Sequence, residues 1–155
     1  MTAAYLKEYF MAKLRHIAMA VSNPDATAKF YEQAFGMKRV RESKLSIHLS
    51  DGVVNLAILD NQNNQEALGH QGLHHLGFIV DDVDQAAAQV EGGGAVYTDK
   101  PDNVVARKTV RETTMDAKAL PEAMRMQQRK YQDPNSVNFD IVNGEHARLS
   151  WHIPG

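Results

Sequence analysis

Two stretches of the chain share one pattern of apolar and polar positions. Residues 14–21 and 74–80 are bulky and mostly apolar, which is typical of buried strands. Each stretch has a histidine near its start, His16 in the first and His75 in the second, and these histidines are 59 residues apart. The repeated spacing predicts a duplicated architecture in which the two strands are related by a pseudo-two-fold axis. Strands related in this way can direct their histidines toward one shared point.

Each predicted strand leads into an amphipathic helix with start and stop signals of its own. In the first repeat, Ser22 or Asn23 can cap the helix, and Gly36 is expected to end it. In the second repeat, Asp81 or Asp82 can act as the cap, and three consecutive glycines follow the helix. The sequence therefore predicts one strand–helix unit in each half of the chain.

Short alternating runs follow both predicted helices. In the first half they cover residues 37–42, 45–49 and 53–59, and the Asp-Gly pair between the second and third runs is a strong hairpin signal. In the second half, strands are predicted near residues 95–98 and 137–142. Each half is therefore expected to form a βαβββ module.

The segment between these last two predicted strands has no counterpart in the first half. Residues 100–130 contain eight Lys or Arg and four acidic residues, a net charge of +4, whereas the rest of the chain carries −6. The part from Leu120 or Pro121 to Lys130 is a candidate helix, because proline suits a first helical turn. A positive field of this kind can attract anions at moderate salt, although a solvated basic helix would have the same composition.

The predicted elements divide the chain into a short series of segments. Residues 60–71 are polar and lack periodicity, which indicates a linker. We expect an N-terminal extension at 1–12, a first module at 13–60, a linker at 61–71, a second module at 72–145 with the basic insert 100–130, and a C-terminal tail at 146–155. Met11 is an alternative start to Met1.

Composition excludes several kinds of site. The chain has no cysteine, so disulfides, thiolate metal sites and a cysteine nucleophile are all excluded. Its net charge of −2 gives no general reason to expect nucleic-acid binding. The apolar runs are far shorter than a membrane span, and the first ten residues lack the features of a secretory signal. A cytoplasmic protein is therefore expected, with neither nucleic acid nor membrane as its partner.

The two strand–histidine–helix units and the closing stretch from Asp133 to Val142 resemble the vicinal oxygen chelate superfamily, which includes glyoxalases, extradiol dioxygenases, methylmalonyl-CoA epimerases and bleomycin-resistance proteins. The resemblance covers about residues 13–143. The usual closing motif of the family is Asp-Pro-Asp-Gly-Asn-x-(Ile/Leu)-Glu-Leu. This chain has Asn-Ser-Val where Asp-Gly-Asn is usual, and Asp140 where Glu is usual. The resemblance implies an α+β fold, in which tandem βαβββ modules form a curled mixed sheet around a metal or ligand cavity.

The resemblance also implies a set of metal ligands. In such folds the ligands come from the first and last strands of each module, which assigns three of the four positions to His16, His75 and Asp140. The fourth position falls on or near Ala57, and alanine cannot bind a metal. Two histidines and one carboxylate form a facial triad that leaves coordination positions open and is typical of non-haem Fe(II). Mn, Zn, Ni and Co are alternative divalent ions.

Other side chains are candidates for a role near the metal. We predict His48 and Tyr131 as catalytic residues, since His48 can line the cavity and Tyr131 lies just before the Asp-Pro of the closing motif. Asn138 can line the cavity as well. His74 points to the opposite face from His75 and is expected to be structural or to support its neighbour.

Two classes of function are compatible with these residues. A metal-dependent enzyme would bind two oxygens of its substrate to the ion, which acts as a Lewis acid. Within that class, three ligands favour a dioxygenase over a four-ligand glyoxalase- or epimerase-type lyase or isomerase. The other class is a metal-free drug- or metabolite-binding protein of the bleomycin-resistance type. In either case we expect a small-molecule partner, anionic or rich in oxygen, and a homodimer.

Overall fold

The computed structural model describes residues 11–98 and 126–155, and it contains two βαβββ modules in tandem. The first module consists of β1 (Lys13–Val21), α1 (Pro24–Phe35), β2 (Lys38–Glu42), β3 (Ser46–Ser50) and β4 (Asn55–Asp60). The second consists of β5 (Gly72–Ile79), α2 (Val83–Gly92), β6 (Val96–Tyr97), β7 (Gln128–Gln132) and β8 (Asn138–Val142). A short helix α5 (Gly144–His146) and a π-helical segment η2 (Ala147–Trp151) follow. The predicted α+β fold of tandem βαβββ modules is confirmed.

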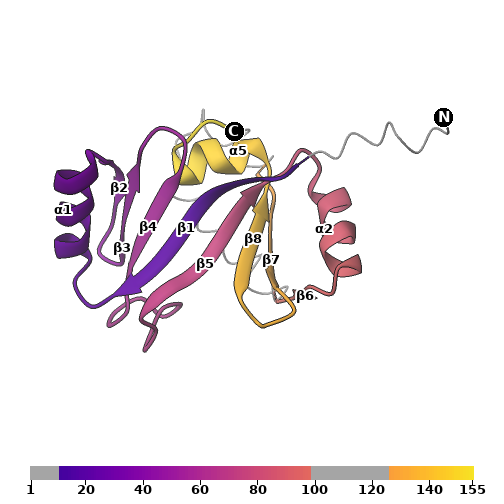
Figure 1. The fold of residues 1–155 in the computed structure, drawn as a ribbon, viewed down its shortest axis with the longest axis horizontal. Coiled ribbons are helices and arrows are strands. Elements are labelled where there is room, and N and C mark those ends of the chain that lie inside the picture. Colours follow the sequence, from indigo (N-terminus) through magenta and orange to yellow (C-terminus); the bar gives the residue numbers. More distant parts are fainter. Residues whose placement is uncertain (1–10, 99–125) are drawn as a thin grey trace.

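The strands form one eight-stranded mixed sheet in the order β2-β3-β4-β1-β5-β8-β7-β6. β1 and β5 pair antiparallel at its centre, and each also pairs in parallel with the last strand of its own module, β4 or β8. A pseudo-two-fold axis between β1 and β5 therefore relates the two modules, as the sequence repeat predicted. The curled sheet lies between α1 and α2, which flank it on opposite sides in Figure 1.

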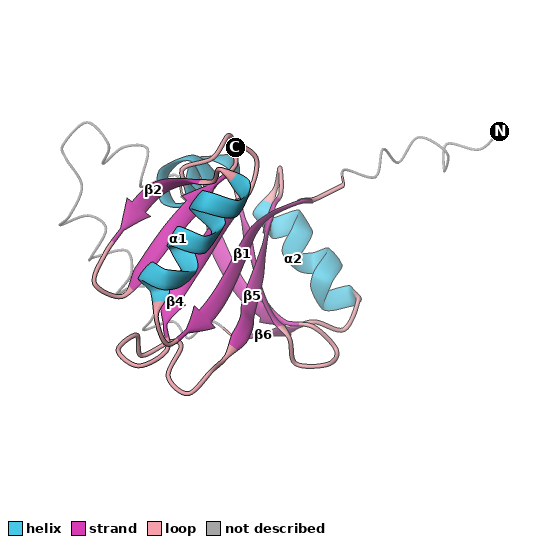
Figure 2. Ribbon diagram, turned by 60° about the vertical axis from the view of Figure 1, so that its left-hand side comes forward, coloured by secondary structure: helices cyan, strands magenta, loops and turns pink. Residues whose placement is uncertain are grey.

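Both helices begin at capping side chains that the sequence had suggested. The Asn23 side chain accepts a hydrogen bond from the Ala26 backbone N–H at 3.0 Å. The Asp82 side chain accepts one from the Gln85 backbone N–H at 2.9 Å. α1 ends at Gly36, which has a φ of 68° and so needs the freedom of glycine. In Figure 2 both helices run alongside the strands of their own module. Among the described residues, no helix is long and apolar enough to cross a bilayer.

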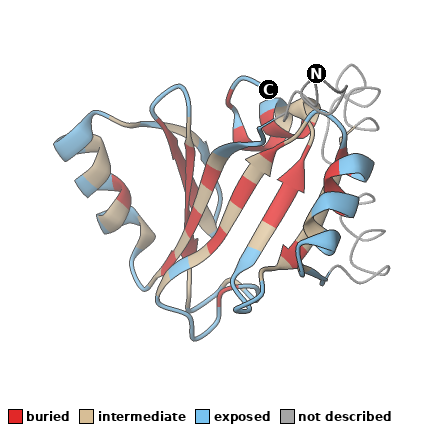
Figure 3. Ribbon diagram, turned by 45° about the vertical axis from the view of Figure 1, so that its right-hand side comes forward, coloured by how far each residue is buried: buried red, intermediate tan, exposed pale blue. Residues whose placement is uncertain are grey.

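The two faces of the sheet differ in character, because successive side chains of a strand point to opposite faces. The outer face packs against the helices in two apolar clusters. These clusters contain Ala28, Ile47, Leu49, Leu56 and Ile58 beside α1, and Val83, Ala86, Ala87, Tyr131 and Ile141 beside α2. The opposite face, called the inner face below, carries small residues such as Ala18 and Ala57 together with buried polar side chains. Figure 3 shows how the buried positions alternate along the central strands.

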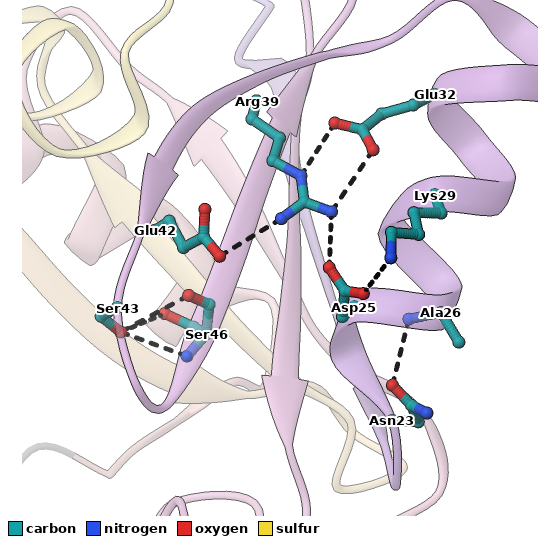
Figure 4. Close-up of polar contacts among 9 residues, drawn as sticks. All are labelled: Asn23, Asp25, Ala26, Lys29, Glu32, Arg39, Glu42, Ser43 and Ser46. Atoms are coloured by element: carbon teal, nitrogen blue, oxygen red, sulfur yellow. Dashed lines mark hydrogen bonds and ion pairs between the residues drawn. The ribbon is translucent and has the colours of Figure 1, made fainter.

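A charged network on the surface joins α1 to β2 (Figure 4). The guanidinium group of Arg39 forms ion pairs with three carboxylates, those of Glu32 (2.8 Å), Asp25 (2.9 Å) and Glu42 (3.2 Å). Hydrogen bonds to Glu32 and then to Asp25 raise the pKa of Arg39 above its ordinary value. Lys29 pairs with Asp25 at 2.8 Å from the same helix. The network holds the first helix against a strand at the edge of the sheet.

One element in the second module differs from the expectation. Residues 128–130 were expected at the end of a helix, but they lie in β7, which pairs antiparallel with β8. The alternation that identifies most strands is absent here, because both faces of β7 carry long polar side chains. The start of the expected helix and most of the basic insert, residues 99–125, lie outside the described residues.

The residues after β8 fold back onto the inner face. Ala147, Trp151 and Ile153 pack against Ile79 of β5 and Val142 of β8. The sequence had indicated only a C-terminal tail here. We call residues 144–153 the C-terminal segment, since it covers part of the face that carries the predicted ligands.

The Arg39 network predicts a measurable contribution to thermal stability. Arg39→Met leaves three carboxylates close together without their shared cation, so we expect the midpoint of thermal unfolding to fall by a few degrees. The loss should be larger at low salt, where charge repulsion is less screened. Lys29→Met, which removes a single exposed ion pair, is the control and should have little effect. Equal unfolding midpoints for wild type and Arg39→Met at low salt would contradict the prediction.

Candidate metal centre

His16 and His75 meet on the inner face at the centre of the sheet. In the antiparallel register of β1 and β5, His16 lies opposite Gly77 and His75 lies opposite Ala18. The two Nε2 atoms are 3.0 Å apart. Asp140 of β8 lies opposite Gly77 on the other side, and its Oδ2 is 3.5 Å from Nε2 of His75. The structure thus brings together the three residues that were predicted as metal ligands.

The register also identifies the position that would complete a symmetric site. Ala18 lies opposite Ala57 in the first module, as Gly77 lies opposite Asp140 in the second. Because Ala18 and Gly77 occupy equivalent places, Ala57 is the counterpart of Asp140. The first module therefore supplies no carboxylate at this position.

The hydrogen bonds of Asn55 determine which nitrogen of His16 carries the proton. The Asn55 amide nitrogen donates to the Trp151 carbonyl at 2.8 Å, so the amide oxygen is the atom that faces His16. Nδ1 of His16 lies 2.8 Å from this oxygen, which can only accept, and Nδ1 must therefore be protonated. Nε2 of the neutral ring is then an unprotonated acceptor directed at His75.

His74 has the same effect on His75. Nε2 of His74 is 2.7 Å from the Glu66 carbonyl oxygen and must donate to it. In a neutral His74, Nδ1 is then an acceptor, so Nδ1 of His75, 2.7 Å away, is the donor. Nε2 of His75 is left unprotonated. His74 therefore holds the proton of His75 on Nδ1, the ring nitrogen that points away from His16.

Two nitrogen lone pairs thus face each other beside a carboxylate. Burial, followed by the charge of His75, lowers the pKa of His16 to about 3. Burial, followed by the charge of Lys130, lowers the pKa of His75 to about 3. Both rings are therefore neutral at pH 7. Neither Nε2 atom carries a proton, so no hydrogen bond connects the two Nε2 atoms. A cation bound by both nitrogens would relieve their repulsion, and neutral imidazole is a common metal ligand.

In this structure Asp140 forms an ion pair with Lys130. Nζ of Lys130 is 3.3 Å from Oδ1 and 3.4 Å from Oδ2, and the Gln128 amide donates to Oδ2 at 3.1 Å. Within residues 11–98 and 126–155, no three His, Cys, Asp or Glu side chains stand as a group ready to hold a metal ion. The donor atoms of His16, His75 and Asp140 fit a divalent cation in kind. Completing the set requires the carboxylate to turn from Lys130 toward the histidines.

His48 lies on the inner face, one strand beyond Asn55. Its Nδ1 is 3.3 Å from the Asn55 amide oxygen that also accepts the hydrogen bond from His16. Its Nε2 is 3.4 Å from the Ser46 hydroxyl. His48 is therefore connected to the candidate ligands through a shared acceptor.

Tyr131 lies on the outer face, contrary to the expectation that it is near the metal. It is buried beneath α2, and its hydroxyl donates to a carboxylate oxygen of Glu91 at 2.8 Å. The reason is the alternation of β7, which directs Lys130 inward and Tyr131 outward. Asn138 is exposed and accepts a hydrogen bond from Gln132. We leave Tyr131 and Asn138 out of the candidate site.

Trp151 of the C-terminal segment covers His16. The two rings are stacked with their centroids 4.5 Å apart and their planes at 7°. A Cβ atom on Gly77 would lie 2.7 Å from Cβ of His16 and 2.7 Å from Cη2 of Trp151, so only glycine fits opposite them. His16 is 4% exposed and His75 is 9% exposed. A ligand therefore reaches the pair only when the side chains that cover it move.

A separate cavity of about 430 Å³ opens beside the start of α2. Its lining includes the acidic residues Asp81, Asp82, Asp84 and Glu145, and it includes none of the predicted ligands. An acidic cavity disfavours an anionic substrate, so this cavity is a poor match for the expected ligand.

Three residues of this arrangement are not predicted as site residues from the sequence: Asn55, Lys130 and Trp151. Asn55 does carry a signal, because it is a polar residue inside the apolar run 53–59. In the sequence, Lys130 is only one of the eight positive charges of the basic insert 100–130. Trp151 carries no local signal, since its contact with Asn55 joins residues 96 positions apart.

The buried histidines predict a loss of stability in mild acid. The folded-state pKa values of His16 and His75 are about 3, and that of His48 is about 4, all below the ordinary 6.5. Below pH 6.5 the unfolded chain therefore binds protons that the folded chain does not. The free energy of unfolding should be constant above pH 6.5 and fall toward pH 4.5 by up to about 1.4 kcal/mol per pH unit for each histidine. Denaturant titrations with a chelator present measure this, and His16→Gln should give a shallower slope.

Gly77 predicts a strong steric effect at the same place. Gly77→Ala inserts a methyl group between His16 and Trp151, and overpacking of this kind costs about 1–3 kcal/mol of unfolding free energy. Gly92→Ala is the matched control, because nothing lies within 4 Å of its added Cβ. Urea unfolding compares the two variants. Equal stabilities would mean that Trp151 does not pack on His16 as described.

A family model described as Glyoxalase/Bleomycin resistance protein/Dioxygenase superfamily matches residues 13–116. No curated protein sequence matches the chain significantly.

Solved structures share the fold. A methylmalonyl-CoA epimerase in complex with methylmalonyl-CoA and NH4+ has a TM-score of 0.54 and 21% identity, over 86% of this chain and 94% of that chain. A variant of the Streptomyces coelicolor methylmalonyl-CoA epimerase in complex with 2-nitronate-propionyl-CoA gives the same values. The Mycobacterium tuberculosis methylmalonyl-CoA epimerase has a TM-score of 0.53 and 18% identity, over 84% of this chain and 86% of that chain. The family match over residues 13–116, with which the fold of repeated modules agrees, shows that the chain belongs to the glyoxalase/bleomycin resistance protein/dioxygenase superfamily.

Proposed function

We propose that the protein is a divalent-metal-dependent enzyme of the isomerase or lyase type, with His16, His75 and Asp140 as its metal ligands. The observation that carries the proposal is the pair of unprotonated Nε2 atoms, 3.0 Å apart and beside a buried carboxylate. Such donors suit Fe(II), Mn, Zn, Ni or Co. A bound ion would act as a Lewis acid toward two neighbouring oxygens of a small substrate and stabilise the negative charge that develops on them.

We assign His48 as the group that accepts a proton from the substrate. Burial, followed by the charge of Arg41, lowers the pKa of His48 to about 4, so the ring is neutral at pH 7 and has one nitrogen able to accept. Because Nδ1 faces the Asn55 oxygen, the accepting nitrogen is Nε2. The shared contact with Asn55 keeps this base on the same face as the metal ligands.

The similar solved structures support an isomerase over the dioxygenase that the ligand count alone suggested. Those compared above are methylmalonyl-CoA epimerases, and epimerisation needs a proton acceptor rather than molecular oxygen. At about one fifth identity the likeness concerns the fold, so neither their substrate nor their ligand set is carried over. His48 is the feature of this chain that supports the same class of chemistry.

A dioxygenase is the second candidate, and Ala57 is the observation that favours it. With alanine at the counterpart of Asp140, the protein offers one carboxylate and two imidazoles, which leaves several coordination positions for substrate and oxygen. The metal-free binding protein is the third candidate. A small anionic substrate and a homodimer stay predictions for all three.

Metal titration of the purified protein tests the proposal. We expect calorimetry with Co²⁺ or Mn²⁺ to show one site per chain. His16→Gln, His75→Gln and Asp140→Asn should each weaken binding by roughly a hundredfold or more, since each removes one of three ligands. His74→Ala should weaken binding by only about tenfold, because its role is to hold the tautomer of His75.

His70→Gln is the matched control, because this exposed histidine bonds a backbone carbonyl outside the site, and its metal affinity should equal that of wild type. Wild-type protein that binds no divalent ion would favour the metal-free binding protein. Full affinity in Asp140→Asn alone would show that the third ligand is another group.

A further inference from the structure

We propose that Lys130 is an exchangeable counter-cation of the candidate metal centre: it holds Asp140 when no metal is bound, and it is released to bind an anionic group of the substrate when the metal takes Asp140. The proposal rests on the metal site proposed above. It assigns to Lys130 both a competition with the metal and a part in selecting the ligand.

The sheet register makes Lys130 and Asp140 direct neighbours. They are paired residues of β7 and β8, and both side chains point to the inner face. Nζ of Lys130 lies 3.3 Å from one carboxylate oxygen and 3.4 Å from the other, so the ammonium group is shared between them. Asp140 is buried, whereas the Lys130 side chain is 26% exposed. The lysine can therefore swing outward more easily than the aspartate can.

The present pairing is incompatible with a complete metal site. Both oxygens of Asp140 face the ammonium group, and Gln128 donates to one of them as well. Oδ2 remains 3.5 Å from Nε2 of His75. A divalent ion bound to Asp140 and to His75 would have to displace Lys130, because two cations cannot share this buried carboxylate without strong repulsion. Metal binding must therefore break the Lys130–Asp140 ion pair, and the free energy of that pair lowers the metal affinity.

The charge of the inner face then indicates the kind of ligand. On the described strands, the register places one carboxylate and several cations on the inner face: Asp140, with Lys130, Arg41 (opposite His48), Lys38 (opposite Ser50) and Lys13 (opposite Ile79). These side chains carry more positive than negative charge, and a divalent ion would add two further positive charges. A neutral substrate leaves that charge uncompensated, whereas an anionic one offsets part of it.

Displacement of Lys130 from Asp140 would leave its ammonium group close to the ion and within reach of the substrate. A substrate that presents two neighbouring oxygens to the metal and carries a negative charge would meet both cations at once. A 2-oxo acid, with a carboxylate beside a carbonyl, has this chemistry. The inference is therefore that the site selects small carboxylate-bearing ligands and that Lys130 contributes to the selection.

Two affinities measured on Lys130→Met test the proposal. We expect the affinity for Co²⁺ to rise by roughly tenfold, because a competitor for Asp140 has been removed. We expect the affinity of the Co²⁺-loaded protein for pyruvate to fall by roughly tenfold, whereas that for its uncharged ester, methyl pyruvate, should not change. The visible spectrum of bound Co²⁺ reports both ligands. Lys130→Arg keeps the charge and should retain the preference for pyruvate over the ester.

Lys29→Met is the control, because it removes the same charge from α1 on the outer side of the molecule and should leave every affinity unchanged. A Lys130→Met protein with lower Co²⁺ affinity would overturn the proposal, since Lys130 would then support the metal site. Unchanged pyruvate affinity would overturn the assignment of Lys130 to the ligand while leaving the metal site intact. Wild-type protein that binds no Co²⁺ would overturn the proposed function and this inference together.

Discussion

The antiparallel pairing of β1 with β5 brings two neutral imidazole rings to within 3.0 Å of each other in a buried part of the sheet. Burial lowers the pKa of both rings and keeps them neutral, and the neighbouring side chains hold them in place. Asn55 and His74 hold the proton of each ring on the far nitrogen, and Trp151 fixes the plane of one ring by stacking on it. Gly77 is the residue that makes room for the stack.

The duplicated modules are symmetric in backbone and asymmetric in chemistry. The pseudo-two-fold axis relates His16 to His75, but it also relates Ala57 to Asp140. A cation between the histidines would therefore be drawn away from the axis toward the second module, where the only carboxylate of the set lies. The first module contributes the neighbouring groups Asn55 and His48 instead. In the proposed function both modules therefore hold the ion through a histidine, while the second module adds the carboxylate Asp140 and the first adds the proton acceptor His48, a division that a strictly symmetric site would not allow.

The parts of the fold that could be predicted from the sequence are those with local signals. The spacing of His16 and His75, the caps of both helices and the Asp-Gly hairpin each depend on residues close together in the chain, and the structure has these elements. Contacts between distant segments have no such signal. β7 was missed because its inward residues are polar, and with it the inward position of Lys130 and the outward position of Tyr131. The position of the C-terminal segment could not be predicted, because it depends on the packing of Trp151 against Gly77 and not on a local sequence pattern.

Trp151 is the only tryptophan of the chain, and it is stacked on a candidate metal ligand. Its fluorescence therefore comes from one buried position rather than from an average over the molecule. A paramagnetic ion bound to His16 would lie close enough to quench that emission, and displacement of the C-terminal segment into water would shift it to longer wavelength. The residue that closes the site over His16 is thus also a built-in optical probe of whether the site is filled or open.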